Sequence, residues 1–228
     1  VGDKFIQDIE ARNGKVFAAN GFGIVVINAT NGEVIENYQS IGENATDVTA
    51  FELATTSDKL VAITSQGIQT GLLNQNLLDF NNWQTIASDT SVYKGLDLIS
   101  PDEVVSIVDN NTILAFDLNG NGARVLLNSD EIIHQISVFE GKLYALISNS
   151  VYLVENQDIT LIRESDQPIN TFHMNDGLWL GTNDSGMIAP NGEPVLPNGP
   201  ISEFSHLSFT DNSTYGFYGP AVESYTDQ

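Results

Sequence analysis

The sequence of 228 residues contains no cysteine, few basic residues and no long apolar run. Without cysteine, disulfides and cysteine-based metal sites are excluded. Lys and Arg total 8 against 30 Asp and Glu, which gives a net charge of −22. A phosphate backbone is repelled by such a surface, so nucleic acid is a poor partner. No apolar run approaches the roughly 18 residues that a membrane-spanning helix needs, so no transmembrane segment is expected.

The chain begins with Val1 instead of Met, and no basic and then apolar leader precedes the first predicted strand. This start is typical of a processed or excised segment. We therefore expect the sequence to be part of a larger protein.

A strand-turn-strand signature occurs five times in the chain, and a sixth copy is truncated. The copies align on the first apolar residue of their second strand: Val16, Leu60, Val104, Leu143 and Leu178. A repeat of about 40 residues with this content predicts the blades of a β-propeller. The predicted blades cover about residues 4–44, 45–90, 91–130, 131–166 and 167–200, with a partial copy at 201–228.

Within each copy the pattern predicts four short strands. The first strand alternates, as at residues 5–10, and turn dipeptides such as Asn13-Gly14 lead into the second. Strands two and three are apolar on both faces, as expected for a blade packed between two neighbours, and the fourth regains polar residues. The best helical candidate, at residues 74–80, is short. We therefore predict an all-β fold, a β-propeller segment of five to six four-stranded blades, forming a single domain or fragment over residues 1–228. The pattern is compatible with a propeller that closes within this chain and with a segment of a larger propeller.

Three segments resemble the N-terminal propeller of the PorZ family. They are the strand at residues 22–26 (FGIVV), the turn at 41–44 (IGEN) and the segment at 76–83 (NLLDFNNW). Separately, residues 178–182 (LWLGT) are similar to the Trp-x-Gly-Thr turn of two-component regulator propellers. The PorZ resemblance is strongest over residues 4–86, and elsewhere it consists only of propeller repeats.

The resemblance implies a non-enzymatic interaction scaffold of a type IX secretion assembly, the PorZ family being associated with delivery of anionic lipopolysaccharide to the sortase. It also implies export to the periplasm or the outer-membrane cell surface. The implied partners are secretion-system proteins such as a surface sortase, with anionic lipopolysaccharide as a further candidate. The net charge of −22 opposes an anionic glycolipid within a Debye length of roughly 8 Å, so such contact needs a local basic or cation-bridged spot.

Asp117, Asn119 and Asn121 are spaced like the first ligands of a calcium loop, with Gly122 at the sixth position. The twelfth position is Asn128, where such loops have a bidentate Glu. The same residues are typical of a hairpin turn, and we favour the turn over the calcium site. No other metal or cofactor is expected.

His134, His173 and His206 all fall in predicted first strands, which line the channel of a propeller. His134 and His206 lie nine residues before the anchors of their copies, but His173 lies five residues before its own. Unequal offsets argue against a shared ring of metal ligands, so we interpret the three histidines as ordinary polar strand positions.

Residues for covalent catalysis are not evident, since the chain has neither cysteine nor a Gly-x-Ser-x-Gly elbow. Paired carboxylates carry no weight among 30 acidic residues. Trp83 and Trp179 are interpreted as packing anchors in preference to sugar platforms. The alternative function is a ligand-sensing ectodomain of a two-component regulator, and a third, a glycan-cleaving enzyme, has no residue constellation behind it.

Overall fold

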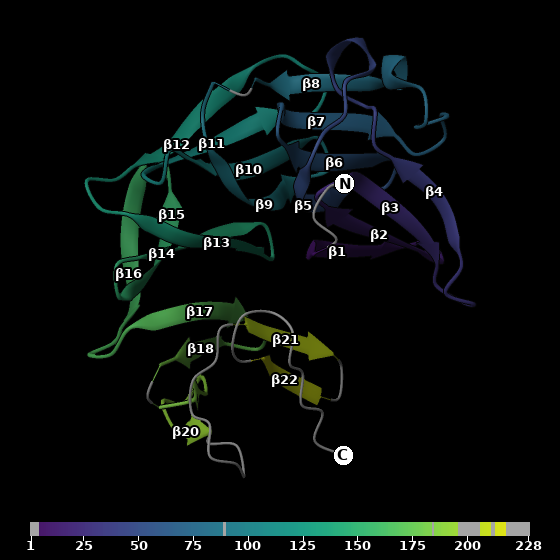
Figure 1. Cartoon of the computed structure of the whole chain (residues 1–228). Coiled ribbons are helices and arrows are strands. Elements are labelled where there is room, and N and C mark those ends of the chain that lie inside the picture. Colours follow the sequence, from purple (N-terminus) through teal and green to yellow (C-terminus); the bar gives the residue numbers. More distant parts are fainter. Residues whose placement is uncertain (1–4, 89, 184, 196–205, 211–212, 218–228) are drawn as a thin grey trace. The chain divides into compact units, whose positions relative to one another are not determined.

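The computed structural model describes residues 5–88, 90–183, 185–195, 206–210 and 213–217. These residues form five four-stranded antiparallel sheets and one two-stranded hairpin. Most of their strands are labelled in Figure 1. The helical content of this described part is two short 3-10 turns, η1 (Glu43–Ala45) and η2 (Phe80–Asn82). No helix of the described part has the length and apolar character needed to cross a membrane.

The chain divides into two compact units, Val1–Asn128 and Ser129–Gln228. Three blades make up the first unit: β1 (Ile6–Arg12), β2 (Lys15–Asn20), β3 (Gly23–Asn28) and β4 (Val34–Tyr38); β5 (Ala50–Thr55), β6 (Lys59–Thr64), β7 (Gly67–Leu72) and β8 (Trp83–Ala87); β9 (Tyr93–Ser100), β10 (Glu103–Val108), β11 (Thr112–Asp117) and β12 (Ala123–Asn128). The second unit begins with β13 (Ile133–Phe139), β14 (Lys142–Ile147), β15 (Ser150–Glu155) and β16 (Asp158–Glu164).

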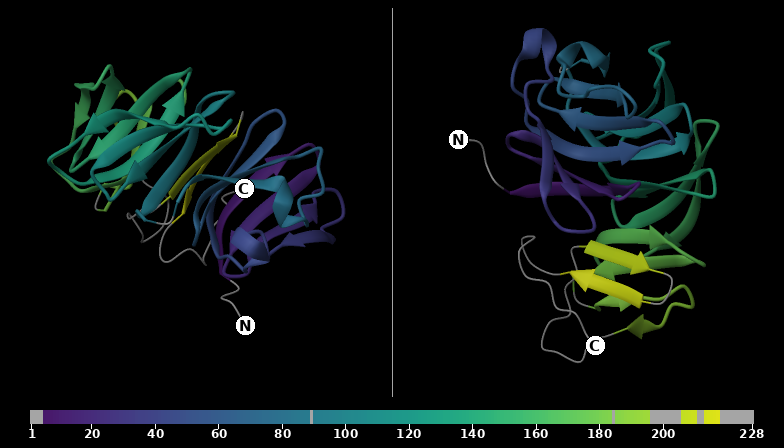
Figure 2. Two further views of the ribbon diagram at one scale, coloured as in Figure 1. Left: turned by 90° about the horizontal axis from the view of Figure 1, so that it is seen from above. Right: turned by 90° about the vertical axis from the view of Figure 1, so that its right-hand side faces the viewer.

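The fifth blade consists of β17 (Ile169–Met174), β18 (Leu178–Thr182) and the two-residue strands β19 (Met187–Ile188) and β20 (Pro194–Val195). The truncated sixth copy forms the hairpin of β21 (His206–Thr210) and β22 (Ser213–Phe217), drawn in yellow in Figure 2. The prediction of an all-β propeller segment with four-stranded blades is confirmed. The remainder of the sixth copy lies outside the described residues.

Every predicted anchor lies in the second strand of its blade. Each second strand is paired on both sides, and β6 is buried at all six of its residues, from Lys59 to Thr64. The predicted turns also have the backbone that their residues favour: φ is 49° at Asn13 and 73° at Gly14, and 51° and 72° at Glu140 and Gly141. Two consecutive left-handed residues match the twist of a tight hairpin, which is why these short links connect the first and second strands.

The first strand of all five four-stranded blades contains an irregular step in its pairing with the second strand. In β1, β5, β13 and β17 the step inserts one residue, so that two residues stand opposite one; in β9 the step at the corresponding place inserts Gly95. The residues directly after the insertion are Asp8, Glu52, Leu96, Gln135 and Thr171. A bulge of this kind bends the strand and redirects the side chain that follows it.

Three of these redirected side chains bond to the first strand of the next blade in their own unit. The backbone N–H of Leu53 donates to Asp8 Oδ2 (2.7 Å), and those of Gly95 and Leu96 donate to the two carboxylate oxygens of Glu52 (2.9 and 2.8 Å). In the second unit the backbone N–H of Phe172 donates to Gln135 Oε1 (2.9 Å), and Gln135 Nε2 donates to the Phe172 carbonyl (3.0 Å). We call these contacts the blade latches.

Candidate functional site

A groove of about 820 Å³ lies on the second blade, between the loop that precedes β5 and the loop that precedes β8. We call it the blade-2 groove. Its lining side chains are mostly amides, hydroxyls and apolar groups: Ile41, Gly42, Glu43, Asn44, Thr46, Gln66, Gln69, Phe80, Asn81, Trp83, Thr85 and Ser88. Glu43 carries a charge, and the other lining residues are neutral.

The first wall of the blade-2 groove is held in place by Gln66, which follows β6. Gln66 Oε1 accepts the backbone N–H of Glu43 (2.9 Å), and its Nε2 donates to Thr46 Oγ1 (2.6 Å). Thr46 Oγ1 in turn donates to the Glu43 carbonyl (2.9 Å). One glutamine therefore fixes both ends of the turn at residues 43–46.

The backbone of this wall requires particular residues. A Cβ added to Gly42 would lie 2.5 Å from Gln66 Oε1 and 2.6 Å from Thr46 Oγ1, so a glycine is needed for the glutamine to reach the turn. Asn44 and Ala45 both adopt left-handed backbone, with φ of 57° and 59°. Asn tolerates this region, but for Ala it costs about 1–2 kcal/mol. The wall therefore holds local strain that the surrounding hydrogen bonds maintain.

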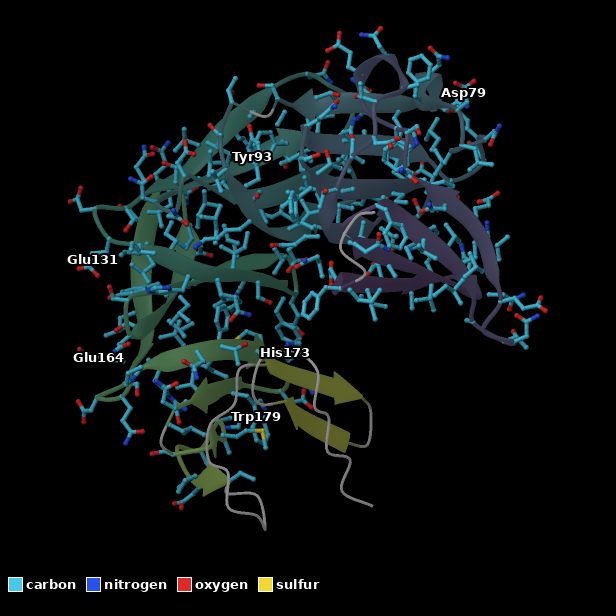
Figure 3. All side chains as sticks on the ribbon, viewed as in Figure 1. Asp79, Tyr93, Glu131, Glu164, His173 and Trp179 are labelled. Atoms are coloured by element: carbon cyan, nitrogen blue, oxygen red, sulfur yellow. The ribbon has the colours of Figure 1, made fainter. Side chains whose placement is uncertain are left out.

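The second wall is the segment between β7 and β8. Asp79 Oδ1 accepts both the backbone N–H (3.0 Å) and the side-chain Nδ2 (2.8 Å) of Asn81, and this caps η2. Asp79 is labelled beside this turn in Figure 3. Asn82 Nδ2 closes the segment by donating to the Asn76 carbonyl (2.9 Å).

The floor of the blade-2 groove is part of the core between the first two blades. Trp83 is 9% exposed, its Nε1 donates to the Leu77 carbonyl (2.9 Å), and its ring meets that of Tyr38 edge-on at 6.0 Å. Ile41 and Leu77 belong to the same buried cluster. The ring of Trp83 is a packing anchor, as the sequence predicted, and it supports both walls.

Gln69 links this floor to the first wall. Its side chain is buried; Nε2 donates to the Ile41 carbonyl (3.2 Å), and Oε1 accepts from Thr64 Oγ1 (3.2 Å). Phe80 is half-buried and adds an aromatic surface to the lining. A concave site with amide and hydroxyl groups around a small apolar surface suits a polar ligand that is recognised by hydrogen bonds.

The predicted calcium-loop residues lie in the turn between β11 and β12. Asp117 Oδ1 accepts the backbone N–H of Asn119 (2.6 Å), and Oδ2 accepts Asn121 Nδ2 (3.0 Å). These bonds lower the pKa of Asp117, with the Asn121 bond contributing most. Asn119 Oδ1 accepts the ammonium of Lys59 (2.8 Å), beside a cavity of about 530 Å³. The hairpin turn is present, and calcium binding by Asp117, Asn119 and Asn121 stays a prediction.

The three histidines lie in first strands, as predicted: His134 in β13, His173 in β17 and His206 in β21. His134 is the inserted residue of its bulge and is exposed, whereas burial lowers the pKa of His173. Among the described residues, no three His, Asp or Glu side chains are grouped so that they could hold a metal ion. Trp179 in β18 is partly buried.

Two features of the site were not predicted from the sequence. The first is the meeting of residues 41–44 and 76–83 at one groove, for which the sequence gives no distance signal. The second is the blade latch, which does have a signal. Asp8, Glu52 and Gln135 each lie eight residues before the anchor of their copy, and Leu96 occupies the same offset in the third. A polar residue at a constant offset in a half-buried strand could have indicated a repeated contact.

The four-stranded blades, in series along the chain, define the class of this protein as an all-β propeller segment. The family model described as TSS9, PorZ, N-terminal beta-propeller domain matches residues 1–84. The resemblance to PorZ is therefore confirmed over a range that contains all three of its predicted segments. No curated protein matches the sequence.

Solved structures support the same fold. The chain is similar to PorZ of Porphyromonas gingivalis, described as an essential bacterial surface component of the type IX secretion system, with a TM-score of 0.60 and 17% identity. It is also similar to the extracellular domain of the putative hybrid two component system BT3049 from B. thetaiotaomicron (0.69, 13%) and to YCF48 from Cyanidioschyzon merolae (0.69, 11%). These matches cover 95%, 95% and 94% of this chain. The chain spans 30% of the PorZ structure, 32% of BT3049 and 80% of YCF48, and at these identities the likeness shows the fold alone.

Proposed function

We propose that this propeller segment is a non-enzymatic docking module of a PorZ-type component of type IX secretion, exported to the periplasm or the outer-membrane cell surface. One observation carries the proposal. Two segments that resemble the PorZ propeller, at residues 41–44 and 76–83, lie far apart in sequence and form the two walls of the blade-2 groove. The third, at residues 22–26, contributes Ile24 and Val26 to the core beneath it.

The construction of the groove supports docking. The first wall is fixed by Gln66 and the second by Asp79, so little ordering is needed when a partner binds. Left-handed backbone at Asn44 and Ala45 is the kind of local strain that accumulates at binding sites. The lining is neutral except at Glu43, so in a chain of net charge −22 the groove gives an acidic protein partner a place to dock with little like-charge repulsion. A secretion-system protein such as a surface sortase is the partner that we propose.

The direct test is a substitution of Phe80 in the full-length protein within the bacterium that produces it. Phe80→Asp places a charge in the groove without opening the core, because Phe80 is half-buried. Val125→Asp on β12 is the matched control, since Val125 is 40% exposed and outside the groove. We expect the first variant to lose surface attachment of type IX cargo and the second to retain it, with both proteins present at wild-type levels. Normal attachment in the Phe80 variant would refute the proposal.

Anionic lipopolysaccharide is a second proposed partner, and its binding should depend on a cation. The net charge of −22 repels an anionic glycolipid, and of the two ways to overcome this, a local basic spot or a bridging cation, we propose that a divalent cation bridges the two. Purified lipopolysaccharide should bind the chain in calcium and lose that binding in chelator. Binding at about micromolar affinity or tighter in chelator would contradict this expectation.

The alternative function is a ligand-sensing ectodomain, which the fold likeness to the BT3049 extracellular domain favours. The two functions predict different further domains in the parent protein. A transmembrane helix followed by a kinase would support the sensor, and a second propeller with a β-sandwich would support the secretion component. An enzymatic function would require that the protein cleaves a member of a glycan panel and that single carboxylate substitutions abolish the cleavage.

A further inference from the structure

The outer strand of the fourth blade exposes an unusual amount of apolar side chain. In β16, Ile159, Leu161 and Ile162 are 45%, 51% and 42% exposed, and every residue except the partly buried Arg163 is exposed. The outer strands β4, β8 and β12 each contain at least one buried residue. Among the described four-stranded blades, β16 is therefore the least buried of the outer strands that have five or more residues.

The backbone of β16 offers hydrogen-bonding groups on its outer side. A two-residue turn with left-handed Asn156 (φ 53°) and Gln157 (φ 68°) joins β15 to β16, which makes Glu155 and Asp158 a hydrogen-bonded pair. Because such pairs alternate along an antiparallel ladder, Ile159 and Leu161 direct their N–H and C=O groups away from β15.

These outward groups are unused within the described part of the chain. β16 pairs there with β15 alone, and no backbone hydrogen bond of the turns and loops reaches Ile159 or Leu161. An unpaired edge of this kind is a template for another strand.

The usual protections of an edge strand are few in β16. The strand has neither Pro nor Lys, and its one irregularity is the extra residue Ile162 opposite the step from Val151 to Tyr152. Its basic residue, Arg163, is directed to the fifth blade, where the guanidinium donates to the carbonyls of Ala189 (3.2 Å) and Pro190 (2.7 Å). The edge therefore lacks a repelling cation.

Carboxylates stand at both ends of the exposed edge. Asp158 begins β16 and Glu164 ends it, both are exposed, and Glu164 is labelled at the end of this strand in Figure 3. Glu155 is also exposed and faces Asp158 across the turn. Negative charge at both ends favours a partner with positive charge at matching places.

We propose that β16 binds an extended segment of another protein by strand addition, and that this segment has alternating β-branched residues between basic ends. Backbone groups of Ile159 and Leu161 pair with the added strand, and its Lys or Arg residues lie against Asp158 and Glu164. A second copy of this chain is disfavoured as occupant because both copies carry −22. The proposal does not depend on the blade-2 groove.

The test uses a synthetic peptide of about nine residues in which Val and Thr alternate between paired Lys residues. Amide hydrogen exchange of the whole chain is measured with and without the peptide. We expect exchange at Ile159 and Leu161 to slow by about tenfold or more, while Thr160, whose N–H is already directed to β15, changes little. A peptide N-methylated at alternate amides, and one flanked by Glu, should both fail to bind.

Two variants make the result specific to this edge. Leu161→Lys should weaken peptide binding at least about tenfold, because it removes apolar contact and adds a like charge. Val125→Lys on β12 introduces the same charge at a 40% exposed position and should leave the affinity unchanged. Equal binding by the Glu-flanked peptide, or unchanged exchange at Ile159 and Leu161, would overturn the proposal. Protection of these amides by self-association of the chain would also overturn it, since the occupant would be a second copy.

Discussion

The blade latches use a carboxylate in the unit Val1–Asn128 and an amide in the unit Ser129–Gln228. Glu52 accepts two backbone N–H groups, from Gly95 and Leu96, whereas Gln135 accepts one N–H from Phe172 and donates to the carbonyl of the same residue. An ionised carboxylate has only acceptors, and an amide has an acceptor and two donors. Each side chain therefore matches the backbone groups that the next blade presents to it.

The two chemistries differ in their response to pH. Burial raises the pKa of Glu52, the N–H bonds from Gly95 and Leu96 lower it, the charge of Asp8 raises it, and Lys94 lowers it. The net direction is upward from the ordinary value of 4.5. Gln135 has no such titration. The comparison teaches that one structural position can join blades with a pH-dependent contact in one unit and a pH-independent contact in the other.

The largest expected effect comes from deleting the acceptor in the first unit. Glu52→Ala leaves the N–H groups of Gly95 and Leu96 without their acceptor, which should lower the free energy of unfolding by about 2 kcal/mol or more at pH 7. Urea unfolding measures the loss, and amide exchange at Leu96 shows whether it is local.

Gln135→Ala is the matched change in the second unit. It should cost about 1–2 kcal/mol and speed exchange at Phe172 while leaving Leu96 unaffected. A loss below about 0.5 kcal/mol in both variants would show that the latches do not stabilise the blades.

Placing a carboxylate at the latch of the second unit tests whether the amide is required there. In Gln135→Glu a carboxylate oxygen faces the Phe172 carbonyl, so the variant should lose about 1–3 kcal/mol at pH 7. At pH 4 the protonated carboxyl donates to that carbonyl, and most of the loss should be recovered. Unfolding in urea at the two pH values checks this. Gln7→Glu, an exposed change at the bulge of β1, should show a smaller difference.

Removing the charge of Glu52 should remove its contribution to the pH dependence of the first unit. Because the folded-state pKa of Glu52 is raised, the folded state binds the extra proton, and the stabilisation is present below 4.5 and lost as pH rises through the folded pKa. The stability of wild type relative to Glu52→Gln should therefore fall as pH rises above 4.5, after a constant offset of about 1 kcal/mol for the lost acceptor. Thr160→Ser, an exposed change in β16 that alters no ionisable group, is the control and should show no such slope. A relative stability that rises with pH would contradict the sign.

Part of this comparison was available in the sequence. The repeat predicted the blades. Anchors such as Val104 lie in second strands because a segment that is apolar on both faces fits a strand that is paired on both edges and covered on both faces. The latch partners could not be predicted, since Glu52 binds backbone N–H groups that every residue except proline carries. Leu96, at the same offset, also interrupts the pattern.

The blade-2 groove was hidden for a related reason. Residues 41–44 and 76–83 are distinctive in the sequence, but their contact in the fold depends on Gln66 and Trp83. The local sequence predicts only an amide at a strand end and a packing aromatic at these two positions. A single sequence gives the period of strands and the chemistry of turns. It does not give the direction in which loops of different blades fold toward one another.

The smallest expected effect concerns Lys94, which lies in β9 and lowers the pKa of Glu52 by its charge. Burial lowers the pKa of Lys94 itself, and the charge of Glu52 opposes this change. A double-mutant cycle of Glu52→Gln and Lys94→Met should give a favourable coupling of no more than about 1 kcal/mol at pH 7. The coupling should decrease toward pH 4, because a protonated Glu52 has no charge for Lys94 to attract. The same cycle with Gln135 in place of Glu52 should give none at either pH. A coupling that persists at pH 4 would mean that Lys94 acts on the latch by packing and not by its charge.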